Sequence, residues 1–329
     1  MAGFQRILLT GGGGFVGSYL APLLTQAYPD AQKAMLALGE DRVAAAPCGG
    51  WTLARGDLLD APAIEAIVSA LRPDLVVHLA GQASIGTALG AAEQTWRANL
   101  HGSFNLAAAL ARHTPETTLL FASSASVYGA SLLDGPATEN APLRPLDAYG
   151  RSKVAAEGAL ADVLGPRSRL LIARPVNHSG PRQSEKFFVL SSFAAQIAAM
   201  ESGRAPPLLH VGDLSKTRDF LDVRDVVSAY MAMIDNAAKM PERVNCFNVA
   251  SGEPHPIGYF LDGLRRESHT AFETVVEAHL LRPSTIDIPV ISCDATKLRK
   301  LTGWRQRHSV DDMLKSLLDY WRSVESARA

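Results

Sequence analysis

The chain has 329 residues, 47% of them hydrophobic, and a formal net charge of −1. This is enough for a sizeable core, built as one two-lobed unit or two closely joined domains. The balanced charge gives no general attraction to nucleic acid or an anionic membrane, and no apolar segment reaches the ~20 residues of a membrane helix. The three cysteines form no CxxC pair, so no zinc site or disulfide framework is indicated. We expect a cytoplasmic protein without a metal ion.

A short apolar run near the N-terminus leads through glycines into a helix. Residues 7–9 suit a buried parallel strand, and residues 15–20 have helical apolar spacing. Between them Gly11, Gly14 and Gly17 form the frame GxxGxxG. In such a frame one glycine permits the turn, one lets the backbone approach a pyrophosphate, and one lets helix and strand pack closely.

Four consecutive glycines also occur in flexible linkers and plain turns. The strand before them and the amphipathic helix after them favour a dinucleotide site, with the phosphates facing the free N–H groups of the helix N-terminus. The predicted coenzyme contacts of this segment are Gly11, Gly14, Phe15, Val16 and Gly17.

Residues 33–38 predict a second strand. At its end, dinucleotide-binding folds place an acidic group for a ribose hydroxyl or a basic group for a 2′-phosphate. Here Glu40, Asp41 and Arg42 are adjacent, and Gly39 can take the decisive position. A solvated charged loop explains these residues equally well. Arg42 inclines the prediction slightly toward NADP, with NAD as the alternative.

Strands and helices then alternate. Residues 51–58 predict a third strand that ends near Asp57, residues 61–71 a helix, and residues 75–81 a fourth strand. Asp57 can face the coenzyme or cap the following helix, and both interpretations stay open. For His78, inside an apolar strand end, a hydrogen-bonded core position is favoured over a catalytic one.

A helix over residues 95–112 and a buried strand over residues 119–122 continue the alternation. Alternating strands and helices predict an α/β fold with a doubly wound parallel sheet, the Rossmann arrangement, followed by a smaller mixed α/β lobe. Residues 222–234 and 310–321 predict amphipathic helices, in which Met231, Met233 and the stripe around Trp321 pack in a core.

The pattern with most chemical content comes in the middle of the chain. A serine-rich segment that contains Ser124 follows the strand, and Tyr149 and Lys153 come one helical turn apart about 25 residues later. Free tyrosine, with a pKa near ~10, is hardly ionised at neutral pH. A lysine ammonium one turn away stabilises the phenolate and brings the phenol closer to a working acid or base. We predict Ser124, Tyr149 and Lys153 as the catalytic group, although YxxxK alone is a frequent coincidence.

Phosphate groups of a substrate are best held by arginine, whose planar fork offers several donors. Arg182, Arg218 and Arg282 are the candidates, with Asn177 donating from its amide. Each arginine taken alone is equally explained as a surface residue.

Together these motifs resemble the extended short-chain dehydrogenase/reductase family that acts on nucleotide sugars, over nearly the whole chain. Further blocks that resemble this family lie at residues 173–183, 217–225, 247–252 and 281–283. Asn177, His178 and the segment 282–298 look most like enzymes of GDP-mannose-derived sugars. The resemblance implies a coenzyme domain at 1–175, to which 222–250 returns, and a substrate lobe at 176–221 and 251–329.

The resemblance also implies roles for single residues. Asn99 supports the active site, Ser126 contacts the substrate, and the sheet-flanking helices that carry Asn99 and Tyr149 form a homodimer. Dehydratases of this family have an acidic residue where this chain has Ser126, whose hydroxyl is no base near neutral pH. Dehydration is therefore disfavoured. The loops that face the coenzyme add Asp57, Leu58, Leu79, Ala80, Gly81 and Asn99 to the predicted contacts.

We therefore expect a reductase in which hydride reaches carbon 4 of a GDP-linked 4-keto sugar while Tyr149 donates a proton. A 4-epimerase of the UDP-glucose/galactose type, with the same residues and a retained NAD, is the main alternative. A GDP-mannose 4,6-dehydratase is less favoured, and a non-catalytic dinucleotide sensor is the alternative from another class.

Overall fold

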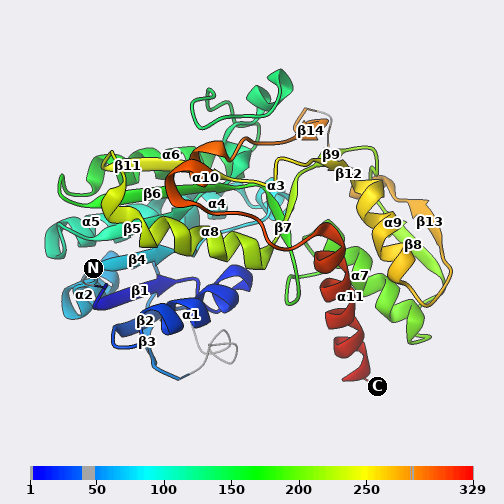
Figure 1. Ribbon diagram of the computed structural model, residues 1–329, viewed down its shortest axis with the longest axis horizontal. Coiled ribbons are helices and arrows are strands. Elements are labelled where there is room, and N and C mark those ends of the chain that lie inside the picture. The colour runs from blue at the N-terminus through cyan, green and yellow to red at the C-terminus, as the bar shows by residue number, and fades with distance from the viewer. Residues whose placement is uncertain (1–2, 39–48, 282, 284, 329) are drawn as a thin grey trace.

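The computed structural model describes residues 3–38, 49–281, 283 and 285–328 (Figure 1). The predictions made for Gly39, Glu40, Asp41, Arg42 and Arg282 lie outside the described residues. The described chain forms a large sheet covered by helices, with a smaller helical lobe beside it (Figure 1).

The large sheet has seven parallel strands in the order β11-β6-β5-β4-β1-β2-β3. From β1 the chain goes to β2 on one side and later to β4 on the other, so the carboxyl ends of β1 and β4 form the switch point where such sheets bind ligands. The strands are β1 (Arg6–Thr10), β2 (Gln32–Ala37), β3 (Trp51–Arg55), β4 (Leu75–His78), β5 (Thr118–Ala122), β6 (Arg169–Pro175) and β11 (Val244–Val249).

Helices cover both faces of this sheet. Leu9 of β1 faces the core under α1 (Phe15–Ala27) and α8 (Val223–Asp235). Leu8, its neighbour in sequence, faces the opposite core, because alternate residues of a strand point to opposite faces. That second core is covered by α2 (Ala61–Leu71), α5 (Gly102–His113) and α6 (Ala148–Val163). The predicted doubly wound Rossmann fold is thus confirmed.

A separate core lies in the smaller lobe, where Figure 1 shows α7 (Val189–Glu201), α9 (Ile257–Glu267) and α11 (Val310–Ser326) grouped beside the strands β8 (Leu208–Val211) and β13 (Glu273–Val276). The stripe predicted around Trp321 is buried against the other two helices. The strands β8 and β13 form a parallel pair. The division of the chain into two domains at the bounds given above stays a prediction.

Short elements connect the two parts. β7 (Asn177–Ser179) pairs with β10 (Phe220–Asp222), and β9 (Thr217–Arg218) pairs with β12 (His255–Pro256) and β14 (Val290–Ile291). The remaining elements are α3 (Ile85–Gly90), α4 (Ala92–Trp96), α10 (Thr296–Thr302), and the 3-10 turns η2 (Ala125–Val127), η3 (Ala130–Asp134), η4 (Ala237–Lys239) and η5 (Ala278–Leu280).

Two helix predictions gain detail from the structure. The helix predicted over residues 95–112 contains a π-helical turn, η1 (Arg97–His101), between α4 and α5. Such turns often occur at functional sites. In α8, Met233 is fully buried and Met231 packs against the same core, which confirms their predicted packing role.

Candidate active site

The glycine frame forms a cradle between β1 and α1. Gly11 has a φ of +71°, and a Cβ there would lie 2.7 Å from the Ala80 nitrogen. A Cβ on Gly17 would overlap the Gly11 carbonyl oxygen and lie 2.6 Å from the Gly12 Cα. Gly14 caps α1 without a side chain, so the first N–H groups of the helix are open to an anionic ligand. These residues fit the diphosphate of a dinucleotide coenzyme.

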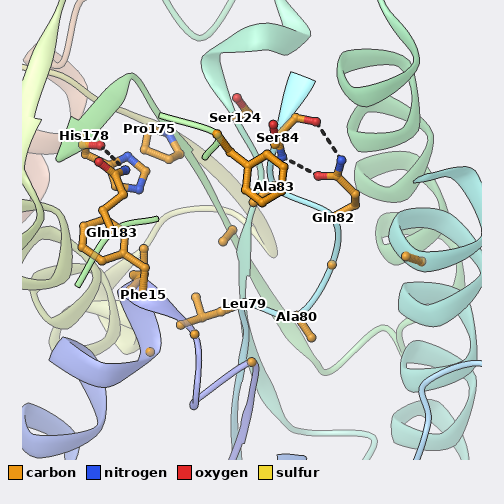
Figure 2. A pocket seen from close by; sticks show the side chains of 18 of the residues that line it. Phe15, Leu79, Ala80, Gln82, Ala83, Ser84, Ser124, Pro175, His178 and Gln183 are labelled. Atoms are coloured by element: carbon orange, nitrogen blue, oxygen red, sulfur yellow. Dashed lines mark hydrogen bonds between the residues drawn. The ribbon is translucent and has the colours of Figure 1, made fainter. Parts of the chain in front are cut away.

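A cleft of about 920 Å³ opens above this cradle, at the carboxyl ends of β1, β4, β5 and β6 (Figure 2). Its size lies in the upper range of ligand pockets. Most of the predicted site residues line it: Gly11, Gly14, Phe15, Val16, Gly17, Asp57, Leu58, Leu79, Ala80, Gly81, Ser124, Ser126, Tyr149, Lys153, Asn177, Arg182 and Arg218.

Asp57 and Asp60 have separate tasks. The Asp60 carboxylate caps α2 by accepting a hydrogen bond from the Ala63 nitrogen at 3.1 Å. Asp57 accepts one from the Leu59 nitrogen at 2.9 Å and lines the cleft. The interpretation of Asp57 as the cap of this helix is therefore wrong, because Asp60, three residues later, is the cap and the helix begins at Ala61.

Asn99 lies behind the cleft wall and is 1% exposed. Its Oδ1 accepts a hydrogen bond from the Gln82 nitrogen at 2.8 Å, and its Nδ2 donates to the Ser152 hydroxyl of α6 at 2.9 Å. Gly81 has a φ of +147°, and a Cβ there would lie 2.6 Å from Asn99 Oδ1. Asn99 thus joins the loop after β4 to the helix that carries Tyr149 and Lys153.

Helix α6 brings Tyr149 and Lys153 to the cleft. The Asp147 carboxylate caps the helix by accepting from the Gly150 nitrogen at 2.8 Å, which fixes where its first turn begins. Lys153 Nζ donates to the Ala122 carbonyl oxygen at 2.8 Å and lies 4.8 Å from the centre of the Phe121 ring. Both side chains of the predicted pair are buried, at 8% and 6% exposure.

Burial is the largest influence on the pKa values of Tyr149 and Lys153. It raises the pKa of Tyr149 to about 12, with the hydrogen bond of Ser124 acting in the opposite direction. It lowers the pKa of Lys153 to about 8, and the Glu157 carboxylate opposes this change. We expected Lys153 to lower the pKa of the phenol, but the cost of burying a phenolate is larger. At neutral pH the tyrosine therefore holds its proton, as a proton donor must.

His78 belongs to the core beneath the site. Its Nδ1 lies 2.7 Å from the Thr10 hydroxyl and its Nε2 lies 2.9 Å from the Ser103 hydroxyl. Burial, followed by the charge of Lys153, lowers the pKa of His78 to about 3. This confirms the prediction of a hydrogen-bonded core histidine.

The predicted substrate residues differ in their surroundings. Asn177, at the start of β7, and Arg182 are exposed and line the cleft. Arg182 has a φ of +74°, a conformation that is uncommon for residues other than glycine and often marks functional sites. Arg218 is buried and donates to Asp287 at 2.8 Å and to the Ile288 carbonyl oxygen at 2.9 Å. Phosphate contacts by these residues stay predictions.

Several residues that line the cleft were not predicted from the sequence. Figure 2 shows Gln82 and Ser84 on one side of Ser124, and Pro175, His178 and Gln183 on the other. Gln82 and Ser84 follow β4 and His178 follows β6, so their position after the strand ends was the available signal.

His178 packs against the coenzyme cradle. Its ring is parallel to that of Phe15 at 6.1 Å between centres. Its Nδ1 lies 3.0 Å from the Val176 carbonyl oxygen, and burial lowers the pKa of the imidazole. The histidine is therefore neutral at physiological pH, with its proton on Nδ1.

Residues 7–250 match the model of the NAD dependent epimerase/dehydratase family, and the chain belongs to this family. It is 34% identical to the GDP-6-deoxy-D-mannose reductase of Pseudomonas aeruginosa, over 97% of this chain and 98% of that protein. The solved structure of RMD from Pseudomonas aeruginosa complexed with NADPH superposes with a TM-score of 0.79 at 32% identity, over 97% of this chain and 100% of that one. The UDP-glucose 4-epimerase of Neisseria gonorrhoeae is 28% identical over 97% of both chains.

Two further observations concern metal ligands and membrane-spanning helices. Within the described ranges, no three His, Cys, Asp or Glu side chains gather in a way that could hold a metal ion. No helix of the described chain combines the length and the apolar character needed to cross a membrane.

Proposed function

We propose that the protein reduces the 4-keto group of GDP-4-keto-6-deoxy-D-mannose to give GDP-D-rhamnose, with NADPH or NADH as the reductant. The observation that carries this proposal is Tyr149, which holds its proton at the wall of the cleft with Ser124 as its hydrogen-bond partner. The 34% identity to a GDP-6-deoxy-D-mannose reductase over nearly the whole chain supports the choice of substrate.

In this proposal the cradle of Gly11, Gly14 and Gly17 would hold the coenzyme, which would supply the hydride for carbon 4. The Tyr149 hydroxyl gives its proton to the oxygen that becomes an alkoxide, and Ser124 holds this oxygen in line with the phenol. Lys153 supplies the charge that stabilises the resulting phenolate. Asn99 keeps the loop after β4 and helix α6 at a fixed separation.

The substrate would enter from the smaller lobe, with its diphosphate held by Asn177, Arg182, Arg218 and Arg282. Arg218 is paired with Asp287 in the structure, so in this proposal its guanidinium contacts the diphosphate and the Asp287 carboxylate at the same time. Ser126 takes the position at which a dehydratase needs an acidic side chain, which argues against elimination of water.

The second candidate is a nucleotide-sugar 4-epimerase, and the relatives with that activity at 28% identity are the observation in its favour. An epimerase would keep its NAD and first oxidise the sugar. A non-catalytic sensor is less favoured because both Tyr149 and Lys153 are present at the cleft.

Mass spectrometry of the nucleotides that stay bound through native purification separates these candidates. A GDP-sugar together with exchangeable NADPH or NADH supports the reductase. A stoichiometric, tightly held NAD together with a UDP-sugar would contradict it and favour the epimerase. Parallel assays with GDP-4-keto-6-deoxy-D-mannose and with UDP-galactose give the same distinction from turnover.

A further inference from the structure

A buried ion pair lies directly below the predicted catalytic group. Arg174 of β6 donates to Glu157 of α6 through Nη2 at 2.6 Å and through Nε at 3.0 Å. Both side chains are about nine-tenths or more buried. Buried ion pairs often stabilise a protein no better than apolar residues of similar volume, because both charges lose their hydration. Stability alone is therefore a weak explanation for this pair.

The pair is connected to the segment after β5 that contains Ser124. The Ser123 hydroxyl donates to the Glu157 carboxylate, and Ser123 is the next residue before Ser124. On its other side Ser123 follows Ala122, whose carbonyl oxygen accepts from Lys153 Nζ at 2.8 Å. One carboxylate thus fixes the short segment that holds both the serine and the lysine.

Arg174, the other member of the pair, is also held by hydrogen bonds. Arg174 Nη1 donates to the Tyr128 hydroxyl at 3.0 Å, and this hydroxyl donates to Asn248 Oδ1 of β11 at 2.6 Å. Arg174 also comes directly before Pro175 and Val176, which line the cleft. The arginine therefore joins Glu157 to β6 and, through Tyr128, to β11.

Glu157 is also the carboxylate placed to act on Lys153 by charge. The two residues are four apart on α6, so they lie on the same face of the helix. The Glu157 charge favours the ammonium form of Lys153 against the effect of burial.

Other titratable groups surround this part of the protein. Those near the Arg174–Glu157 pair or Lys153 are His78, Tyr128, Glu139, Tyr149 and Cys246. On η1 and α5, which pack against α6, Arg97 and His101 are exposed, while Arg112 and His113 pair with Glu65. The negative charge that acts on Lys153 in the folded protein is that of the Glu157 carboxylate, not of any of these neighbouring groups.

We propose that Glu157 is a positioning residue: its carboxylate keeps Lys153 in the ammonium form and, through Ser123, holds the segment that carries Ser124. This inference rests on the proposed function for the chemical use of the lysine charge. The protonation state of Lys153 is independent of the proposed function, because it can be measured without substrate.

The sign of the effect follows from the charges. Burial already places the pKa of Lys153 near 8, and loss of the carboxylate charge removes the influence that opposes burial. In Glu157→Gln the lysine then loses its proton at lower pH, by about one pH unit, since loss of a nearby opposite charge shifts a pKa by ~1 to 3. As the pH is raised, the turnover of this variant would begin to fall at a correspondingly lower pH than that of the parent, because a neutral lysine no longer stabilises the phenolate.

The test is an NMR titration of the ε-carbon of Lys153 in protein made with ¹³C-lysine, with Lys153→Met to assign the signal. Glu157→Asp and Ser123→Ala are the matched controls, since both keep the carboxylate charge. Should Glu157→Gln fail to fold because Arg174 is left unpaired, the double variant Glu157→Gln/Arg174→Gln has no unpaired charge and takes its place. A thermal melt of each variant records its stability separately.

We expect the Lys153 midpoint to be about one pH unit lower in the variant without the carboxylate charge, and close to the parental value in both controls. A midpoint that is unchanged in the folded Glu157→Gln variant or in the double variant would overturn the inference and leave the pair a purely structural one. If the parent protein reduces no keto sugar, the proposed function fails, while the titration still decides the role of Glu157.

Discussion

The Lys153 ammonium nitrogen lies 2.8 Å from the carbonyl oxygen of Ala122, the last residue of β5. This contact ties the catalytic helix α6 to the carboxyl end of the central sheet. It leaves the lysine with further donors, since an ammonium group has three, and the side chain lines the cleft. This buried charge is thus one of the contacts that hold α6 and the end of β5 together, beside the Ser123–Glu157 hydrogen bond and the Arg174–Glu157 pair.

The coenzyme cradle gives the first prediction. Gly17→Ala introduces a Cβ that overlaps the Gly11 carbonyl oxygen, so β1 and α1 must move apart. We expect coenzyme binding to weaken by ~10-fold or more, because a loss of only ~1.4 kcal/mol of binding free energy raises the dissociation constant tenfold. Calorimetric titration with NADPH measures it.

Gly158→Ala is the matched control. Gly158 lies in α6, and a Cβ there meets nothing within 4 Å. This change is expected to leave coenzyme binding unaltered and to stabilise the helix by ~0.5–1 kcal/mol. Equal affinities in the two variants would contradict the cradle.

The choice of coenzyme is the second prediction. We expect NADPH to bind at least as well as NADH, because Arg42 follows the second strand where a 2′-phosphate would lie. Arg42→Ala should weaken NADPH more than NADH, while Arg167→Ala, at an exposed ion pair with Glu116, changes neither. Fluorescence titration of both coenzymes measures this. A clear preference for NADH that persists in Arg42→Ala would refute it.

The third prediction concerns stability in acid. His78 has a pKa of about 3 in the folded protein and near 6.5 when unfolded. Since the pKa of His78 is lower in the folded protein, the contribution of the neutral histidine to the free energy of unfolding is complete above pH ~6.5. This contribution is lost as the pH falls, by ~1.4 kcal/mol per pH unit, until the folded pKa is reached.

Urea unfolding at pH 7 and pH 5 measures this dependence. His78→Gln should lose less stability over this interval than the parent, because glutamine does not titrate. The exposed His279→Gln should lose as much as the parent. If His78→Gln lost as much unfolding free energy between pH 7 and pH 5 as the parent, the buried imidazole would not be the cause of the pH dependence.

Local patterns explain how much of the site was predictable from the sequence. Strand, glycine frame and helix are consecutive, and Tyr149 and Lys153 are one turn apart, so their geometry follows from short-range periodicity. The alternation of strands and helices predicted the doubly wound parallel sheet, while the order of its strands came from the structure.

Partners that are distant in the sequence could not be predicted in this way. Arg218 was selected as a phosphate ligand by residue type, and only the structure shows Asp287, 69 positions later, beside it. The Glu157–Arg174 pair and the π-turn around Asn99 likewise depend on how α6 packs against the sheet and its neighbouring helices. The carboxylate four residues after Lys153 was the available signal for Glu157.

The oligomeric state is the fourth prediction. We expect a homodimer formed through α5 and α6, where Phe104 is 47% exposed and Ala155 and Ala159 are half-buried, while Ala156 faces the sheet. Phe104→Glu should then yield monomers, and Leu280→Glu, at a similarly exposed leucine of the smaller lobe, should not. Light scattering at micromolar concentration measures the mass. A monomeric parent would contradict the prediction.

The most direct test is the turnover of Tyr149→Phe, followed by the loss of reduced-nicotinamide absorbance with GDP-4-keto-6-deoxy-D-mannose, beside the exposed control Tyr259→Phe. A positioned general acid contributes a factor of ~10² to 10⁴, so kcat should fall by that factor, about 3 to 5 kcal/mol of barrier, while coenzyme affinity stays within a few-fold of the parent. Tyr259→Phe should keep the parental rate. Near-parental turnover in Tyr149→Phe would mean that the proton comes from another group, and a parent that interconverts UDP-galactose and UDP-glucose but ignores the keto sugar would replace the reductase with an epimerase.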